Sequence, residues 1–235
     1  MITTVIFDLD DTLYDEIDYC KSGFTAVARY LSQTFSRRIT TDLAYTTLWD
    51  IFESGEHAQT FNHALSALEL KYDEKFIRGL ILIYRKHIPK LHLPRESRQV
   101  LDELKEEFQL AMLTDGYLPG QRLKVKALGI QTYFKHIVYT EQLGRQFWKP
   151  SPAGFETLSK ALNCDYESMV YVGDNIQKDF LAPNQLGMTS IQVIRDLGVH
   201  RESQDDPTAQ PQFKLTGLSE LPQLLTELNA TKTCA

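Results

Sequence analysis

The chain has 235 residues, enough for one large domain or for a domain with an insertion, and its 43% hydrophobic and 24% charged residues are ordinary for a globular protein. Its formal net charge of −6 and its lack of a basic stripe argue against a nucleic-acid partner, because nucleic-acid backbones are bound by clustered Lys and Arg. With three scattered cysteines (Cys20, Cys164 and Cys234), no signal peptide and no long apolar run, we expect a cytoplasmic protein without disulfides, a zinc site or a membrane partner.

Short runs that are apolar throughout recur along the chain, and they predict strands buried on both faces. These runs lie at residues 5–7, 110–113, 137–139, 169–172 and 190–194. Helical patterns lie between most of them, for example over residues 94–107 and after Ser151. The alternation predicts an α/β fold with a doubly wound, Rossmann-like parallel sheet.

Residues 14–93 break this alternation, because they contain one helical pattern after another and no clear strand. The apolar stripes are Phe24, Val27, Leu31 and Phe35; Leu43, Leu48 and Phe52; Phe61, Leu65 and Leu68; and Phe76, Ile77, Leu80 and Tyr84. Each stripe is expected to be core packing. We therefore expect an α/β core domain formed by residues 1–13 and 94–235, with a helical domain inserted at residues 14–93.

Polar residues gather where the predicted strands end. In chain order they are Asp8, Asp10, Asp11, Thr114, Asp115, Lys149, Asp174 and Asp179. Ligands of parallel sheets bind at the carboxyl ends of the strands, so we expect these side chains to meet at one edge.

The expected group of acids needs a cation. Two like charges ~4 Å apart repel by about 4 kcal/mol at an effective dielectric constant of ~20, so Asp8, Asp174 and Asp179 would not all stay ionised alone. Carboxylate oxygens favour a hard ion such as Mg²⁺, which typically also takes waters and substrate phosphate. A dication beside Lys149 forms an anion site within an acidic protein, which predicts phosphoryl transfer.

Four segments resemble the motifs of the haloacid dehalogenase superfamily. They read Asp8-Leu9-Asp10-Asp11-Thr12-Leu13, Thr114-Asp115-Gly116, Lys149-Pro150, and Gly173-Asp174 through Asp179. They occur in the family's order, and the resemblance covers nearly the whole chain because the family also carries a helical cap after the first motif. The resemblance implies a phosphoric monoester hydrolase with a catalytic core and a cap domain.

The resemblance also implies roles at the phosphoryl group. Asp8 would attack phosphorus and form an aspartyl-phosphate, and Asp10 would protonate the leaving alkoxide and then activate the hydrolytic water. Thr114 would donate a hydrogen bond to a phosphoryl oxygen, and Lys149 would neutralise charge on Asp8 and the phosphoryl group. Asp115 would also bind the substrate.

For the metal, the resemblance implies Mg²⁺ held by Asp8, the main-chain carbonyl of Asp10, Asp174 and Asp179. Whether Asp179 binds the metal directly, or holds its waters or Lys149 instead, stays open. Asp11 stands where many members have Gly, and we expect it to point away from the metal. Residues 180–183, Phe-Leu-Ala-Pro, depart from the Gly-Ala pair of many members and leave the start of that helix open.

Asp10 separates activities within the family, because a phosphate ester needs its alkoxide protonated and a carbon–halogen bond does not. We therefore predict a phosphatase for a small phosphorylated metabolite, such as a sugar phosphate or a nucleoside monophosphate. A phosphomutase with the same chemistry, and a non-catalytic phosphoacceptor or binding protein, are the alternatives. The oligomeric state, for which a homodimer is one option, is not determined by the sequence.

Several polar and aromatic residues of the insertion and the rim are candidates for substrate contacts. They are Tyr14, Tyr19, Arg37, Arg38, His57, His63, Tyr117, Arg122 and Trp148. Tyr14 and Trp148 rank first among them because they adjoin the catalytic loop and Lys149 in the chain.

Overall fold

The structure is a computed structural model, and it describes residues 1–195 and 206–233. Its internal contacts divide the chain into two compact units. One unit combines Met1–Ile17 with His92–Ala235, and the other is Asp18–Leu91. Within the described residues, no helix is both long enough and apolar enough to cross a membrane.

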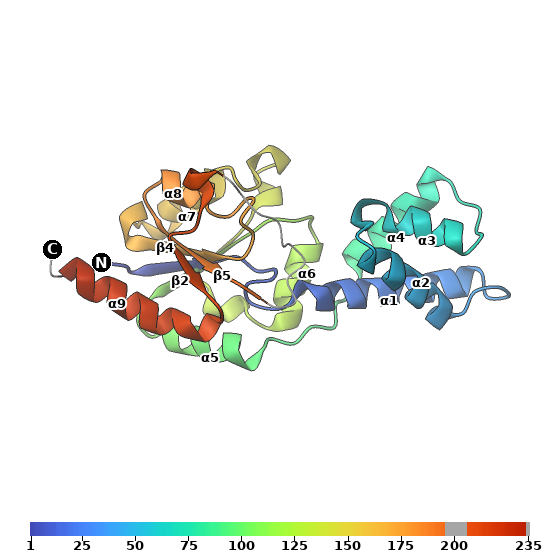
Figure 1. Ribbon diagram of the computed structural model, residues 1–235, viewed down its shortest axis with the longest axis horizontal. Coiled ribbons are helices and arrows are strands. Elements are labelled where there is room, and N and C mark those ends of the chain that lie inside the picture. Colours follow the sequence, from blue (N-terminus) through green and yellow to red (C-terminus); the bar gives the residue numbers. More distant parts are fainter. Residues whose placement is uncertain (196–205, 234–235) are drawn as a thin grey trace. The chain divides into compact units, whose positions relative to one another are not determined.

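The first unit is built on a parallel sheet (Figure 1). In the described residues its strand order is β3-β2-β1-β4-β5-β6. The strands are β1 (Thr4–Phe7), β2 (Gln109–Thr114), β3 (His136–Tyr139), β4 (Met169–Gly173), β5 (Thr189–Val193) and β6 (Phe213–Leu215). The central strands are apolar because helices cover both faces of the sheet. The predicted doubly wound α/β fold is confirmed.

Strand register brings three chain segments to one edge of the sheet. Phe7 at the end of β1 pairs with Met112 of β2 on one side and with Val172 of β4 on the other. The residues that follow these strands therefore start side by side. The strand order reverses between β1 and β4, and such a switch point is where open α/β sheets bind their ligands.

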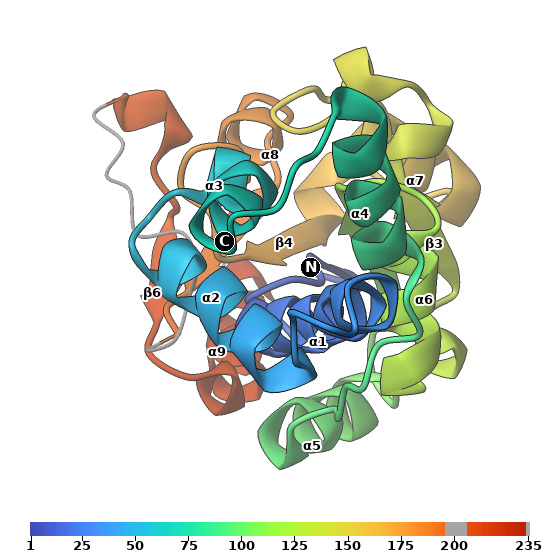
Figure 2. The ribbon, with the colours of Figure 1, turned by 90° about the vertical axis from the view of Figure 1, so that its right-hand side faces the viewer.

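Helices cover both faces of this sheet. They are α5 (Arg95–Leu104), α6 (Gly120–Leu128), α7 (Ala153–Leu162), α8 (Leu181–Gln185) and α9 (Leu221–Thr233). Figure 2 shows α7 and α8 on one side of the sheet and α5 and α9 on the other. The turn after α6 uses Gly129, whose φ of 68° lies in the left-handed region that glycine adopts without strain.

Short 3-10 turns complete the described structure. They are His57–Gln59, Gln131–Tyr133, Thr140–Gln142, Arg145–Phe147, Tyr166–Ser168, Pro207–Ala209 and Leu218–Glu220. One buried cluster lies where the sheet packs against α7 and α8. It comprises Ile6, Ala111, Leu113, Phe155, Leu158, Leu162, Met169, Tyr171, Ala182 and Met188. Half of its members come from the apolar runs that predicted the strands, and the others come from α7, from α8 and from the residue before β5. Strands and the segments beside them therefore share this core.

The second unit contains the helical patterns of the insertion. The helices are α1 (Glu16–Thr34), whose first two residues belong to the first unit, α2 (Thr41–Glu53), α3 (Thr60–Ala67) and α4 (Glu74–Lys86). The side chain of Thr40 caps α2 by accepting a hydrogen bond from Leu43 N at 3.1 Å, and Asp73 caps α4 through Phe76 N at 2.8 Å.

The predicted stripes of this unit supply most of its own core. Its buried members include Phe24, Val27, Leu31, Leu48, Leu65, Leu68 and Leu80. Leu43 differs, because it is 48% exposed. It lies in the first turn of α2, on the side that faces solvent. Its spacing from Leu48, five residues, also fits the helical repeat less well than three or four residues would.

Candidate active site

Asp8 lies at the centre of the site. It follows β1 directly, its main-chain N–H donates to Val172 O at 2.8 Å, and only 3% of the residue is exposed. Burial raises the pKa of its carboxyl to about 7, with Lys149 acting against the rise and Asp179 adding to it. A buried carboxylate with a cation beside it can act as a nucleophile.

Lys149 is the cation beside Asp8. Its Nζ lies 3.0 Å from Asp8 Oδ1 and 2.7 Å from Asp179 Oδ1, and its side chain is fully buried. The same Nζ donates to the hydroxyl of Tyr171 at 2.8 Å, and that hydroxyl donates to Asp179 Oδ1 at 3.2 Å. Burial alone would lower the pKa of Lys149, but Asp179 and Asp8 hold it well above its usual value. The ammonium is therefore charged.

Three acids could hold a metal ion. One oxygen from each of Asp8, Asp174 and Asp179 lies within 4.8 Å of the other two. Burial raises the pKa of Asp174 well above its usual value, and repulsion from Asp179 and Asp8 raises it further. A divalent cation would relieve this repulsion, and an all-oxygen donor set suits Mg²⁺. The residues present therefore fit the predicted ion.

The three acids are not equally available to a metal. Asp179 Oδ1 contacts Lys149 and Tyr171, and its Oδ2 accepts from Asn175 N at 2.9 Å. The Asp174 carboxylate, by contrast, accepts no hydrogen bond from any residue within the ranges described here. Gly173 makes this arrangement possible, because a Cβ atom there would lie 2.5 Å from Asp179 Oδ2.

Asp10 lies in a separate hydrogen-bond network. Lys124 Nζ donates to both of its oxygens at 2.8 Å, Gln121 Nε2 donates to Oδ2 at 2.8 Å, and the Tyr14 hydroxyl donates to Oδ1 at 2.5 Å. Burial alone would raise the pKa of Asp10, but Lys124, Tyr14 and Gln121 together lower it below its usual value. The pKa values of Asp8 and Asp10 are thus shifted in opposite directions, which reflects the different groups around the two carboxyls.

Thr114 is the last residue of β2, and Asp115 follows it at the same edge. The buried Thr114 Oγ1 accepts a hydrogen bond from Gln121 Nε2 at 2.7 Å, which leaves its own hydroxyl proton to donate elsewhere. Asp115 accepts from Thr140 Oγ1 at 2.7 Å and from Lys149 N at 3.1 Å, so its carboxylate holds the loop that carries Lys149. A phosphate contact by Asp115 would have to come from its main chain, because its carboxylate repels anions.

The two departures from the family's motifs have local explanations. Asp11, with a left-handed φ of 49°, accepts a hydrogen bond from the main-chain N–H of Glu16 at 2.7 Å. It therefore satisfies a donor at the start of α1. Pro183 is the third residue of α8, within the first turn, where a missing N–H costs no helical hydrogen bond.

The sequence reasoning missed Gln121, Lys124, Tyr171 and Lys178. Gln121 and Lys124 lie three residues apart in a helical pattern, and each is only 3% exposed. Tyr171 stands inside an apolar run, where its hydroxyl was the available signal, since a buried tyrosine usually finds a polar partner. Lys178 is partly exposed, and its charge opposes the rise in the pKa of Asp174 that burial and the neighbouring acids cause.

Candidate substrate contacts differ in their surroundings. Tyr14 is buried and bonded to Asp10. The indole N–H of Trp148 is buried, and no hydrogen-bond acceptor meets it among the described residues. The Trp148 ring packs edge-on against Tyr117 at 5.3 Å, and the Arg145 guanidinium lies 4.4 Å from the centre of the Tyr117 ring. Tyr117 thus contacts both Trp148, which directly precedes Lys149 in the chain, and Arg145.

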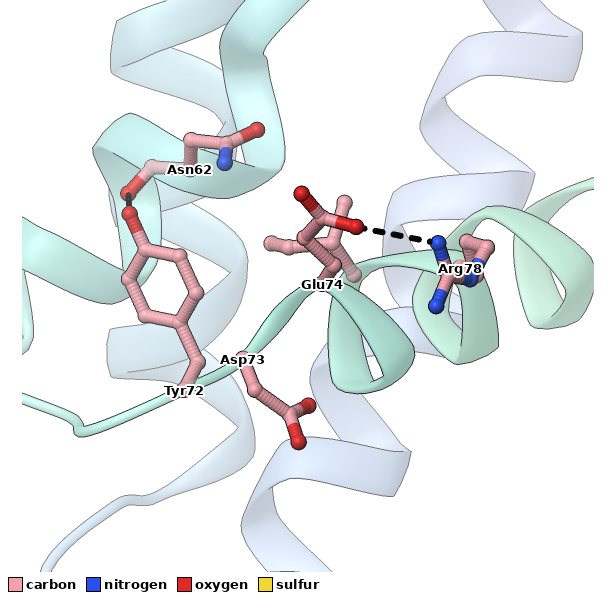
Figure 3. A pocket seen from close by; sticks show the side chains of 6 residues that line it. Asn62, Tyr72, Asp73, Glu74 and Arg78 are labelled. Atoms are coloured by element: carbon pink, nitrogen blue, oxygen red, sulfur yellow. Dashed lines mark hydrogen bonds and ion pairs between the residues drawn. The ribbon is translucent and has the colours of Figure 1, made fainter.

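A separate pocket of about 510 Å³ lies in the helical unit (Figure 3). It is lined by Asn62, Tyr72, Asp73, Glu74, Ile77 and Arg78. Its Arg78 and Glu74 pair at 3.2 Å and are largely exposed. None of its lining residues belongs to the groups around Asp8 or Asp10.

Cys20 and Cys164 are free cysteines, and both lie outside the groups around Asp8 and Asp10. Cys234 falls outside the described residues.

The parallel sheet, with three acids and a buried lysine at the carboxyl ends of its strands, defines an α/β protein whose site could hold a cation and an anion together. A family model described as haloacid dehalogenase-like hydrolase matches residues 5–193. The chain belongs to the haloacid dehalogenase-like hydrolase family. The family match and the relatives below confirm the expected enzyme class, a phosphoric monoester hydrolase.

Curated relatives cover nearly the whole chain. A glyceraldehyde 3-phosphate phosphatase of Methanocaldococcus jannaschii is 27% identical over 97% of this chain and 99% of its own length. The human N-acylneuraminate-9-phosphatase is 23% identical over 97% of this chain and 95% of its own length.

Solved structures share the fold. A HAD hydrolase of Bacillus subtilis, crystallised with magnesium, has a TM-score of 0.67 at 20% identity and covers 95% of this chain and 98% of its own. A 2-haloacid dehalogenase of Pseudomonas syringae has a TM-score of 0.66 at 24% identity and covers 97% of this chain and all of its own, 100%.

Proposed function

We propose that this protein is a Mg²⁺-dependent phosphatase that hydrolyses a small phosphorylated metabolite through an aspartyl-phosphate on Asp8. The observation that carries the proposal is the pair of carboxyls with different surroundings. Asp8 lies beside a buried ammonium and two further acids, whereas Asp10 lies in a network of neutral and cationic donors. Two carboxyls near one sheet edge with separate partners can serve one as a nucleophile and the other as an acid–base residue.

In the first step, an Asp8 oxygen forms a bond to phosphorus while the bond from phosphorus to the leaving oxygen breaks. Asp10 gives a proton to that leaving oxygen, so it must enter this step protonated, against the effect of the donors that lower its pKa. Thr114 has its hydroxyl proton available for a phosphoryl oxygen, and Lys149 offsets the charge that Asp8 shares with the phosphoryl group.

In the second step, water attacks phosphorus and the bond to Asp8 breaks. The water's proton goes to Asp10, whose hydrogen-bond network favours the ionised form that can accept it. The same residue thus serves as acid and then as base.

The metal would be held by Asp8 and Asp174, with the main-chain carbonyl of Asp10 as a further ligand. When bound, Mg²⁺ would stabilise negative charge on the phosphoryl oxygens. Because the oxygens of Asp179 already contact Lys149, Tyr171 and Asn175, we propose that Asp179 chiefly orients Lys149.

For the substrate, we propose a phosphate ester of a small carbohydrate. Two relatives are named for such compounds, glyceraldehyde 3-phosphate and N-acylneuraminate 9-phosphate. We also propose that the helical unit Asp18–Leu91 selects among substrates, because groups around the phosphoryl site contact only the part that all phosphate esters share. The acid at position 10 favours phosphate esters over haloacids.

The test measures phosphate release from a panel of sugar phosphates, sugar-acid phosphates and nucleoside monophosphates, with Mg²⁺ or with EDTA. We expect release from at least one carbohydrate ester, dependent on Mg²⁺. Acid quenching followed by mass spectrometry should find one phosphoryl group on the peptide that contains Asp8. Hydrolysis that persists in Asp8→Asn, or a phosphoryl group on another residue, would contradict the proposal.

Phosphoryl transfer between two hydroxyls of a sugar bisphosphate, without phosphate release, would instead identify a phosphomutase. A cytoplasmic location and the absence of nucleic-acid or membrane partners stay predictions from composition, and a homodimer stays one option that the sequence does not decide.

A further inference from the structure

Helix α6 directs two buried polar side chains at the proposed catalytic carboxyl. Gln121 and Lys124 lie one turn apart, and each is only 3% exposed. Lysine and glutamine seldom lie this deep in a protein, because burying an ammonium or an amide is costly unless hydrogen bonds replace those to water. Here the replacement partners are Asp10 and Thr114, together with Glu16 for Lys124 at 3.1 Å.

Each oxygen of Asp10 is held from two directions. Oδ1 accepts from Tyr14 and Lys124, and Oδ2 accepts from Gln121 and Lys124. Donors on both oxygens restrict rotation of the carboxyl group, so its direction is fixed before a substrate arrives. Such preorganisation matters for proton transfer, which requires hydrogen-bond geometry between the carboxyl and the reacting oxygen.

Gln121 also connects Asp10 to Thr114. Its single amide nitrogen carries two hydrogens, and it lies 2.8 Å from Asp10 Oδ2 and 2.7 Å from Thr114 Oγ1. Because the threonine oxygen accepts here, its own hydrogen must point elsewhere. The Gln121 side chain therefore sets the orientation of both the Asp10 carboxyl and the Thr114 hydroxyl.

Stability alone is a weak explanation for this arrangement. Apolar residues of similar volume often replace a buried ion pair without loss, so a folded core does not require the Lys124–Asp10 contact. Fixing the direction of the Asp10 carboxyl would serve proton transfer rather than stability.

We propose that Lys124 and Gln121 are positioning residues for the proton transfers of Asp10, and that Gln121 also orients the Thr114 hydroxyl. The inference rests on the proposed function, in which Asp10 protonates the leaving oxygen. Lys124 and Gln121 act through Asp10 and Thr114 and need not touch the substrate.

The experiment compares two substrates with different needs for a proton. An alkyl phosphate releases a basic alkoxide that depends on the acid, whereas p-nitrophenyl phosphate releases a stable anion that needs little help. We measure kcat/KM for both, because this quantity reports the step in which the leaving group departs. Asp10→Asn sets the reference, and it should lose about 10²-fold or more on the alkyl ester and much less on the aryl ester.

Lys124→Met should reproduce that selective loss on the alkyl ester, and Lys124→Arg should restore part of it. Gln121→Met should lower kcat/KM on both esters, because Thr114 serves the phosphoryl group of each, and should lower it more on the alkyl ester. Lys126→Met is the matched control, since Lys126 is exposed on the same helix and should match wild type on both esters. Should Lys124→Met fail to fold, Gln121→Met and Lys124→Arg still decide the outcome.

Equal losses on both esters in folded variants would show a merely structural role and overturn the inference. If Asp10→Asn itself shows no selective loss, the acid role in the proposed function fails instead, so the two failures are distinguishable.

Discussion

The ammonium nitrogen of Lys149 lies 2.7 Å from Asp179 Oδ1, and neither side chain is exposed to solvent. Both charges have left water, and each depends on the other for compensation. Asp179 belongs to the loop after β4, whereas Lys149 precedes α7, so the pair joins two separate segments of the sheet edge. The contact also keeps the ammonium within 3.0 Å of Asp8.

This pair predicts a large stability effect. Lys149→Met should lower the free energy of unfolding by about 3–5 kcal/mol, because it leaves Asp179 and Asp8 as uncompensated buried charges. Urea unfolding followed by circular dichroism measures it. Lys105→Met is the control, since its 2.8 Å contact with Asp102 is exposed and should contribute little. If the two substitutions lower the free energy of unfolding equally, the buried contacts of Lys149 do not stabilise the fold as predicted.

Asp8→Asn should keep the fold and lose at least ~10³-fold in kcat, because an amide cannot form the covalent intermediate. Circular dichroism and turnover of p-nitrophenyl phosphate test the two parts. Asp165→Asn, an exposed acid in the same unit, should retain wild-type turnover. More than about a tenth of wild-type activity in Asp8→Asn would show that another group is the nucleophile.

Stabilisation by Mg²⁺ should increase with pH. The pKa of Asp8 rises from its ordinary 3.8 to about 7 in the metal-free folded protein. Between these values the folded state holds a proton that the unfolded state has released, so the free energy of unfolding falls as pH rises across this range. Mg²⁺ competes with that proton, and its binding should therefore add more stability near neutral pH than near pH 4.

Melting temperatures with and without Mg²⁺ across this window test the linkage. A double variant, Asp8→Asn with Asp174→Asn, removes two carboxylates of the acid group and should show no rise with Mg²⁺. A rise that is the same at every pH, or that survives in the double variant, would place the metal elsewhere.

The helical unit gives a further prediction. Replacing Asp18–Leu91 with a short linker should spare Mg²⁺ binding and some hydrolysis of an aryl phosphate, because the proposed phosphoryl-site residues lie outside that range. Preference among metabolite phosphates should disappear, chiefly through lost kcat/KM. The measurement is the ranking of a substrate panel by the folded, trimmed protein. If it ranks the panel as the whole chain does, the helical unit does not select substrates.

Much of the fold could be predicted because buried parallel strands are continuous apolar runs. The exception is β6 (Phe213–Leu215), which has three residues with Lys214 in the middle and so carries no such pattern. Asp8, Asp174 and Asp179 could be predicted because they follow the ends of β1 and β4, whereas Tyr171 lies inside β4 and could not. The network around Asp10 could not, since a lysine at helical spacing ordinarily marks a solvated face. Gln121 and Lys124 are buried where α6 meets Asp10 in the folded chain, which the sequence pattern does not show.

The depth of the site lysines also bears on chemical labelling. The side chain of Lys149 is 0% exposed and that of Lys124 only 4%, so amine-directed reagents should react first with lysines such as Lys21, whose side chain is 47% exposed. The protein can therefore be coupled to a resin through surface amines while these two lysines stay unmodified. Lys178 is partly exposed and is the site lysine that a reagent meets first, and a bound phosphate ester should slow its labelling.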